Sequence, residues 1–258
     1  MNTTDSTTLS YINLFAILGG ALPVLCEQST SAQEILGDRV ISVGFFVKDG
    51  PCGVLRFDHG RVHMERGEGT CDIRLPFRSP EKLNGMMNGT VTPIPSKGFT
   101  KIGFLTGPFT KLTDLLTRYL KPQEKDLENE EFYRLSTILM FHVIMGAVAE
   151  IGNHDRIGRA SAGYIVDGNV RMALTENGQP ITAAYITSVN HQLTTVHADT
   201  NQIMSEMEFD GVKNARNLFD GIASSFTLIC DQKLRMRGMI SQLDNVNRIL
   251  DRVALYLA

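Results

Sequence analysis

The sequence predicts an α+β fold built from two diverged copies of one domain. A segment in the first half aligns without a gap with a segment in the second half. Each aligned segment joins an alternating strand to a short helix that ends in glycine. A charged stretch that contains proline separates the halves. With 258 residues, 43% hydrophobic and 21% charged, the chain has enough apolar material for two ordinary cores.

The alignment places residues 77–89 (FRSPEKLNGMMNG) over residues 209–221 (FDGVKNARNLFDG). Apolar residues recur at i, i+3 and i+4 in both segments, which is one face of a helix. These residues are Leu83, Met86 and Met87 in the first copy, and Ala215, Leu218 and Phe219 in the second. Gly89 and Gly221 follow, and glycine easily leaves a helix through a left-handed conformation. We therefore expect one short helix, with the same stop, in each copy.

Alternation of apolar and polar residues predicts a half-buried strand before each short helix. The apolar positions are Cys71, Ile73, Leu75 and Phe77 in the first copy, and Ile203, Met207 and Phe209 in the second. Further upstream, turn residues predict hairpins at Asp49-Gly50-Pro51, His59-Gly60, Asn177-Gly178 and Asn190-His191. An apolar helix is expected in front of each hairpin region, over residues 9–26 and roughly 131–151.

Each copy is expected to close with a strand, a glycine and a helix. The closing segments are residues 101–120, with Pro108 in the first helical turn, and residues 233–257. Gly107 and Gly238 align with a single-residue gap. Between the copies, residues 121–131 (KPQEKDLENEE) read as a linker. This organisation predicts one domain over residues 1–122 and a second over residues 123–258.

The apolar segment at residues 9–26 (LSYINLFAILGGALPVLC) could be a signal peptide or a membrane anchor. However, the first basic residue is Arg39, and Asn13, Gly19, Gly20 and Pro23 interrupt a stretch that is short for a span. We expect a buried first helix instead. Four cysteines without a CxxC pair favour free thiols in a reducing compartment, so a cytoplasmic location is expected.

The sequence holds no pattern that predicts catalysis. There is no GxSxG, no P-loop and no GxGxxG after a strand, so we expect neither an enzyme nor a cofactor. His59 and His63 have no further ligands at suitable spacing, so no metal site is expected. A formal charge of -3 gives no reason to bind nucleic acid, and at most transient membrane contact is expected. Lys233, Arg235 and Arg237 alternate along one predicted strand, either as a solvated face or as a guide for an anionic headgroup or a partner protein.

The order of these elements resembles the sterol carrier protein type 2 family. The resemblance is strongest over residues 72–93 and 101–120, and in the second half over residues 207–221 and 234–250. It implies, in each copy, a curved, mostly antiparallel sheet covered by helices, with an apolar tunnel between them. It also implies non-covalent lipid binding or transfer, with no catalytic residues to carry over. An acyl chain gains about 0.8 kcal/mol per buried methylene, so it needs no polar anchor.

The resemblance places the ligand against inward strand positions and helix stripes. The implied ligand-binding residues are Leu75, Phe77, Leu83, Met86, Met87, Phe104, Phe109 and Leu112 in the first copy, and Met207, Phe209, Leu218, Phe219, Met236 and Leu243 in the second. The second copy lacks the proline-containing loop at residues 92–96, so one copy alone could bind. Alternatively, these side chains simply fill two cores, and the chain is an accessory subunit of an enzyme of lipid or isoprenoid-quinone metabolism, or a homo-oligomer.

Overall fold

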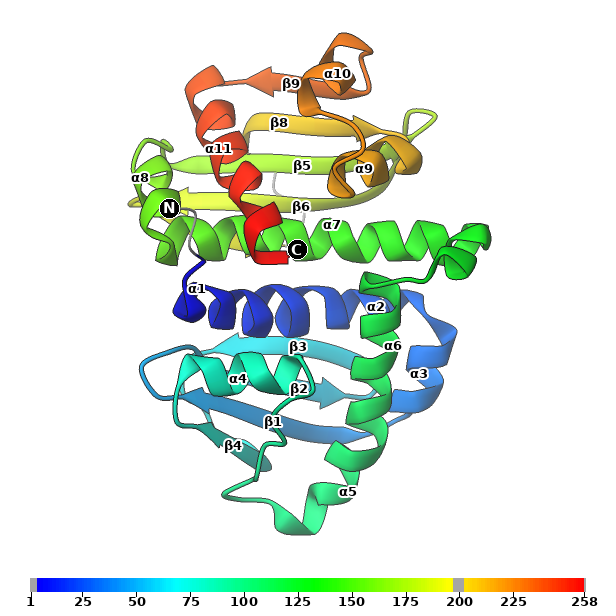
Figure 1. Cartoon of the computed structure of the whole chain (residues 1–258), viewed down its shortest axis with the longest axis vertical. Helices are drawn as coiled ribbons and strands as arrows, with labels where there is room; N and C mark the ends of the chain where they lie inside the picture. The colour runs from blue at the N-terminus through cyan, green and yellow to red at the C-terminus, as the bar shows by residue number, and fades with distance from the viewer. Residues whose placement is uncertain (1–3, 197–201, 258) are drawn as a thin grey trace. The chain divides into compact units, whose positions relative to one another are not determined.

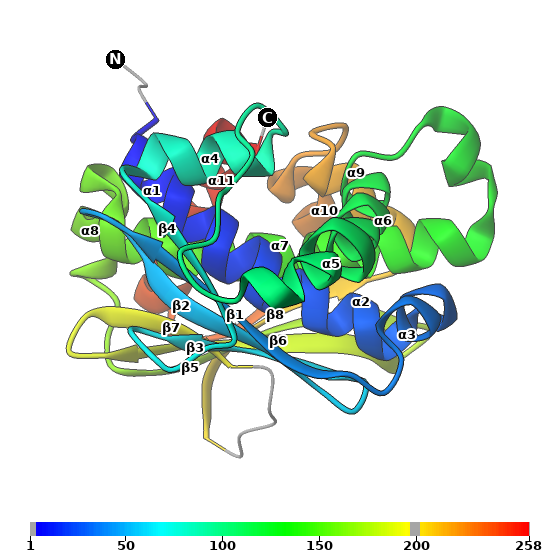
Figure 2. The same ribbon diagram turned by 90° about the horizontal axis from the view of Figure 1, so that it is seen from below.

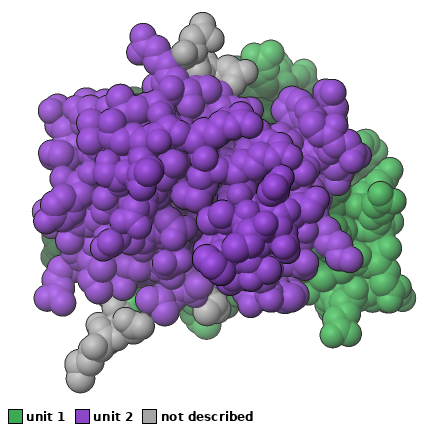
Figure 3. Space-filling model, turned by 90° about the horizontal axis from the view of Figure 1, so that it is seen from above, with its two compact units in different colours: residues 1–139 green, residues 140–258 purple. Residues whose placement is uncertain are grey.

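The computed structural model describes residues 4–196 and 202–257. The chain divides into two compact units, residues 1–139 and 140–258 (Figure 3). Each unit is a mixed sheet with helices on one face (Figures 1 and 2), which confirms the predicted α+β fold class. The domain boundary expected at residue 122 stays a prediction.

The sheet of the first unit has four strands in the order β3-β2-β1-β4. They are β1 (Val40–Val47), β2 (Cys52–Asp58), β3 (Arg61–Arg66) and β4 (Ile73–Phe77). The first three form antiparallel hairpins, whereas β4 runs parallel to β1. The pairing of Phe45 with Leu75 and of Val47 with Phe77 places these side chains on the inner face.

The helices of the first unit begin with one apolar run, α1 (Ser6–Tyr11), η1 (Ile12–Ala21) and α2 (Leu22–Gln28). The others are α3 (Thr30–Leu36), α4 (Pro80–Met87), η2 (Phe99–Lys101), α5 (Ile102–Phe104), η3 (Leu105–Phe109), α6 (Thr110–Leu120) and η4 (Glu124–Glu128). The run Ser6–Gln28 and α7 (Glu130–His154) are long and apolar enough to span a membrane, yet 72% and 89% of their most apolar windows is buried in the folded chain. Core helices of soluble proteins pass the same test, and the expected burial of the first helix is confirmed.

The sheet of the second unit has five strands in the order β7-β6-β5-β8-β9. They are β5 (Gly168–Glu176), β6 (Gln179–Val189), β7 (Gln192–Val196), β8 (Ile203–Asp210) and β9 (Leu234–Gly238). Strand β8 runs parallel to β5 and antiparallel to β9. Its remaining helices are α8 (Arg156–Ala162), α9 (Val212–Phe219), α10 (Ser225–Cys230) and α11 (Ile240–Leu257).

All four predicted hairpin turns are present. Positive φ angles occur at Asp49, His59, Asn177, Asn190 and His191, with glycine following His59 and Asn177 at φ 80° and 75°. Two consecutive residues with positive φ form the type I′ turn that matches the twist of a hairpin. The turn residues therefore set the register of the antiparallel hairpins in both sheets.

The two aligned segments adopt the same local structure. Helices α4 and α9 are eight residues long and start at aligned positions, Pro80 and Val212. Gly89 and Gly221 both have φ 71°. In each case, the two residues after this glycine donate their N–H groups to one carbonyl, that of Gly85 or Asn217. That the whole chain arose by duplication stays a prediction.

The strand expected at the start of residues 101–120 is wrong. Residues 99–120 are helical, and Pro108 lies inside this run, not in its first turn. Proline has no N–H to donate to the preceding turn, and the helix widens here into the π-helical stretch η3. Gly107 is therefore helical, whereas Gly238 at the end of β9 has φ 105°.

Candidate functional site

The predicted ligand-binding residues of the first unit come from β4, α4 and the helical run α5–α6. Most of them are buried, and only the two methionines are partly exposed. The buried ones are Leu75, Phe77, Leu83, Phe104, Phe109 and Leu112, and the partly exposed ones are Met86 and Met87. Whether they line a tunnel stays a prediction.

Four phenylalanine rings pack together where α5 and η3 cover the sheet. Phe57 lies edge-on to Phe104 and Phe109, with ring centroids 5.1 and 6.4 Å apart. Phe45 lies 6.3 Å from Phe109, and Phe104 lies at the same distance from Phe109. Edge-to-face pairs at such distances stabilise a core beyond simple area burial. Phe104 and Phe109 are thus in contact with each other and with Phe57, and whether an acyl chain lies beside them stays a prediction.

The rest of the predicted set lies around β4 and α4. Helix α4 packs against β4 and against α1, and it points Leu83 into the core. Met86 and Met87, in its last turn, keep part of their side chains accessible. Methionine is unbranched and polarisable, so it adapts to apolar partners of variable shape. We call the edge of the inner face beside Leu83, Met86 and Met87 the margin. It is apolar but not completely covered by protein.

The corresponding residues of the second unit are arranged in a similar way. Met207 and Phe209 are fully buried on the inner face of β8. Phe219 of α9 lies edge-on to Phe209 with ring centroids 5.9 Å apart. The remaining predicted residues are Leu218 and Met236, which are partly exposed, and Leu243, which is buried on α11. The apolar pair that ends α9 is therefore only partly covered, as is the pair that ends α4.

A surface hollow of about 810 Å³ lies elsewhere in the first unit, between the α2–α3 junction, the end of α6, η4 and the start of α7. None of the predicted ligand-binding residues lines it. Arg118 pairs there with Asp126 (Nη2–Oδ1 2.6 Å), and the Tyr119 and Phe132 rings stack 4.3 Å apart. The expected linker is thus anchored by this ion pair. The hollow is polar and open, unlike an acyl-chain tunnel.

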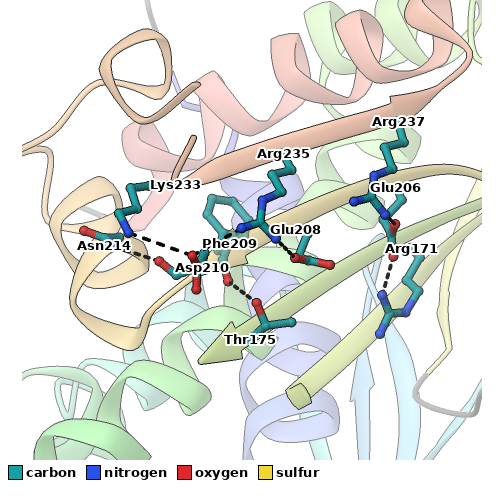
Figure 4. Close-up of polar contacts among 10 residues, drawn as sticks. All are labelled: Arg171, Thr175, Glu206, Glu208, Phe209, Asp210, Asn214, Lys233, Arg235 and Arg237. Atoms are coloured by element: carbon teal, nitrogen blue, oxygen red, sulfur yellow. Dashed lines mark hydrogen bonds and ion pairs between the residues drawn. The ribbon is translucent and has the colours of Figure 1, made fainter. Parts of the chain in front are cut away.

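The basic strand expected in the second half is β9, and its cations are paired (Figure 4). Arg235 Nη1 lies 3.0 Å from Glu208 Oε1, and Lys233 Nζ lies 3.8 Å from Asp210 Oδ2. Glu206 is paired with Arg237 on β9 and with Arg171 on β5. This charge ladder on the outer face leaves little net positive charge to guide an anionic headgroup. It instead holds β9 on the edge of the sheet.

A buried polar cluster in the second unit escaped the sequence reasoning. Asp155 caps α8 by accepting hydrogen bonds from the N–H groups of Ile157 and Gly158, both at 2.8 Å. Its other carboxylate oxygen accepts from Arg252 Nη2 and Tyr256 Oη of α11, also at 2.8 Å. Burial by itself would raise the pKa of Asp155, but these hydrogen bonds and the Arg252 charge outweigh it and lower the pKa. The cluster therefore ties α11 to α8, and we assign it a structural role.

Two of the overlooked core residues, Phe45 and Phe57, could have been found. Each lies on an inward position of a predicted hairpin strand, at spacing two from Val43 and from Leu55. The Asp155 cap also has a signal, an acidic residue directly after the apolar helix. No signal pairs it with Arg252, which lies 97 residues away. Among the residues that the structure describes, no group of three or more His, Cys, Asp or Glu side chains could hold a metal ion.

No protein-family model and no curated protein matches this chain. Several solved sterol carrier protein 2 domains are similar to it in structure. The Yarrowia lipolytica sterol carrier protein 2 aligns at 12% identity and TM-score 0.31, over 40% of this chain and 91% of that one. The Aedes aegypti sterol carrier protein-2 in complex with palmitate aligns at 11% and 0.32, over 42% and 92%. A UbiJ-SCP2 ubiquinone synthesis protein aligns at 10% and 0.32, over 42% and 94%. Each alignment covers nearly all of the solved domain, but these TM-scores are too low to carry an argument about function.

Proposed function

We propose that the first unit binds an apolar, lipid-like ligand without chemical change, at the margin of the inner face formed by β4 and α4. The observation that carries this proposal is the partial exposure of Met86 and Met87 next to buried Leu83. Covering two adjacent apolar side chains at the edge of a core with a hydrocarbon removes their apolar surface from water, which lowers the free energy. We place the ligand on the α4 side of the sheet, because the four rings around Phe109 already pack against one another.

The proposal is for binding or transfer, with no catalytic step, in a cytoplasmic setting that keeps the thiols reduced. All four cysteines are free, and Cys52 and Cys71 belong to one apolar cluster with Phe46 and Val54 without forming a disulfide. The two similar structures named for palmitate and for ubiquinone synthesis do not assign a ligand to this chain. The ligand class is set here only by the apolar character of the margin.

The test uses the full chain in solution, without vesicles. Native mass spectrometry of gently purified protein should show a bound lipid, and a fluorescent fatty acid should bind with saturable enhancement. The double variant M86Q/M87Q should weaken probe binding about tenfold or more, because two apolar side chains at the margin are replaced by polar ones. In the aligned pair of α9, Phe219 packs edge-on against Phe209, so we assign no ligand to that pair, and the control L218Q should leave probe binding in place. A ligand-free spectrum together with no probe uptake would contradict the proposal.

A second candidate function is that of an accessory subunit that packs on a partner enzyme. It is favoured by large exposed apolar side chains in the second unit, Ile222, Phe226 and Ile240, at 75%, 74% and 82% exposure. A protein surface covering them would gain apolar burial without any internal ligand. In the same experiment, this alternative predicts a ligand-free chain and no probe uptake by either the parent protein or its variants.

A further inference from the structure

The segment that joins α4 to α5 presents bulky apolar side chains to solvent. Ile94 is 75% exposed, Phe99 60% and Ile102 44%. Phe104, only two residues after Ile102, is buried against Phe57. The short helical stretch of residues 99–104 thus carries apolar side chains on two sides. One side is buried in the core, and the other is exposed to water. Bulky apolar side chains that are exposed close together favour a site of interaction.

The backbone holds this segment in place. The N–H of Arg74 in β4 donates to the carbonyl of Lys97 (3.1 Å), and the N–H of Ser96 donates to the carbonyl of Arg74 (2.8 Å). Gly98 has φ 88°, and a Cβ atom there would lie 2.4 Å from the carbonyl oxygen of Asp72. Lys101 Nζ pairs with Asp72 Oδ1 at 2.5 Å. The exposed side chains therefore project from a fixed platform.

Residues 82–113, which contain this platform, carry only positive charges, although the chain as a whole has a formal charge of -3. No acidic residue occurs between Glu81 and Asp114, a stretch that contains Lys82, Lys97, Lys101 and Lys111. Among the described residues, Arg74 and Lys97 have no carboxylate partner. Arg74 lies over the Phe46 ring, and the Lys97 ammonium donates to the carbonyl of Cys71. Because they are paired across the bridge, their side chains lie on the same face.

We propose that the α4–α5 surface, defined by Ile94, Phe99, Ile102, Arg74 and Lys97, docks on an anionic lipid bilayer. Apolar side chains that enter the interface, together with cations that face anionic headgroups, are the two contributions such docking needs. Charge complementarity decides the occupant, because Arg74 and Lys97 have no carboxylate partner in the described part of the chain and the segment has no carboxylate of its own. The neighbouring Asp72, just before β4, is paired with Lys101. This inference goes beyond the binding of a single lipid molecule and does not depend on it.

The second unit provides a matched control. Its aligned segment also exposes Ile222 and Phe226, at 75% and 74%. However, it contains Asp220 and Asp231, and the cations that follow on β9 are paired with β8 carboxylates. We therefore assign bilayer docking to the first unit alone.

The test is co-sedimentation of the full chain with phosphatidylcholine vesicles, with and without phosphatidylglycerol. The parent protein should bind the anionic vesicles and be released by salt. F99S/I102S should weaken binding about tenfold or more. K97Q, and R74Q/K97Q, should weaken it about fivefold per charge removed. The control F226S/I229S changes two exposed apolar residues of α10, at 74% and 43% exposure, and should bind as the parent does. Circular dichroism melts should show that every variant is folded.

Three outcomes would overturn the proposal. They are no binding of the parent protein to anionic vesicles, equal binding to vesicles of phosphatidylcholine alone, and an equal loss in F226S/I229S. Self-association of the parent through Phe99 without vesicle binding would identify a second copy as the occupant instead. Since these vesicles carry no acyl probe, the outcome is separate from that of the uptake experiment in solution.

Discussion

The two units differ in what pairs with the last aligned strand of each sheet, β4 in the first unit and β8 in the second. In the second unit, β8 presents Glu206, Glu208 and Asp210 on its outer face, and β9 adds to it with cations opposite. In the first unit, the aligned outward positions of β4 are Arg74, Pro76 and Arg78, and the chain that follows makes only the bridge between Arg74 and Lys97.

The cause lies in two residues of β4. In β8, the N–H of Asp210 donates to the carbonyl of Lys233, so alternate N–H groups of β8 face β9. In β4, the N–H of Arg74 donates outward in the same way, but the next one would belong to Pro76, which has none. Arg74 also faces a like charge, Lys97, which disfavours pairing. A proline and a charge on an edge strand thus disfavour a further strand beside β4, whereas β8 accepts one.

We expect the largest effect on stability when a proline is placed in β8 at Glu208, the position aligned with Pro76 of β4. Glu208→Pro removes an N–H from the β8–β9 ladder and one of the two ion pairs of Arg235, the one with Glu208. We expect the free energy of unfolding of the second unit to fall by about 2 to 3 kcal/mol, because a ladder hydrogen bond and an ion pair are lost together. Hydrogen exchange of the β9 amides, followed by mass spectrometry, should become fast. The reverse change, Pro76→Ala, should leave exchange in the first unit almost unaltered, and fast exchange of β9 in the parent protein would contradict the comparison.

A second difference concerns the residue that caps the helix after each long apolar helix. Ser29 caps α3 through one hydrogen bond to the N–H of Ala32 (3.3 Å), whereas Asp155 caps α8 and also holds Arg252 and Tyr256. Asp155→Asn should therefore lower the free energy of unfolding by about 2 kcal/mol, and Ser29→Ala by about 1 kcal/mol. Urea denaturation measures both. Equal effects would show that the link to α11 contributes nothing.

The same carboxylate predicts a dependence on pH. The pKa of Asp155 is lower in the folded chain than its ordinary value. Its contribution is therefore fully present above the unfolded pKa of about 3.9 and is lost as the pH falls through the folded pKa. The stability difference between the parent protein and Asp155→Asn should be constant near neutral pH and shrink below about pH 4. A difference that persists unchanged in strong acid would count against the assignment.

Thiol labelling is expected to disturb the fold least, and it compares an exposed cysteine with a buried one. Cys230 at the end of α10 is exposed, whereas burial, and then the nearby Glu27 carboxylate, raise the pKa of Cys26 to about 12. The thiolate is the reactive form, so at mildly alkaline pH a maleimide should label Cys230 and spare Cys26. Peptide mapping identifies the labelled residue. Labelling of Cys26 in the native chain would show that the first helix opens readily.

The sequence was most informative where local physics decides the conformation. Turn residues such as Asn177-Gly178 and the glycine stops at Gly89 and Gly221 act through their own φ preferences, and all are as predicted. It was least informative for residues 101–109, where alternating Ile102 and Phe104 resemble a strand. There, the conformation depends on what β4 can pair with, and β4 lacks an N–H at Pro76, more than twenty positions earlier.

The same limit applies to the candidate site. Helix spacing predicted that Leu83 and Leu112 face inward, and both are buried. It could not predict that Phe45 and Phe57 pack with Phe104 and Phe109, because ring packing depends on how separate elements meet. Nor does spacing distinguish a fully covered apolar residue from one at a margin, such as Met86.

The central claim is that an apolar ligand lies against α4 and β4 of the first unit. Photolysis of the full chain with a diazirine-bearing fatty acid, followed by peptide mapping, tests it most directly. We predict labelling within residues 73–87, reduced in M86Q/M87Q and displaced by unlabelled fatty acid. Labelling confined to exposed Phe226 and Ile240, or labelling that excess fatty acid does not displace, would contradict the claim.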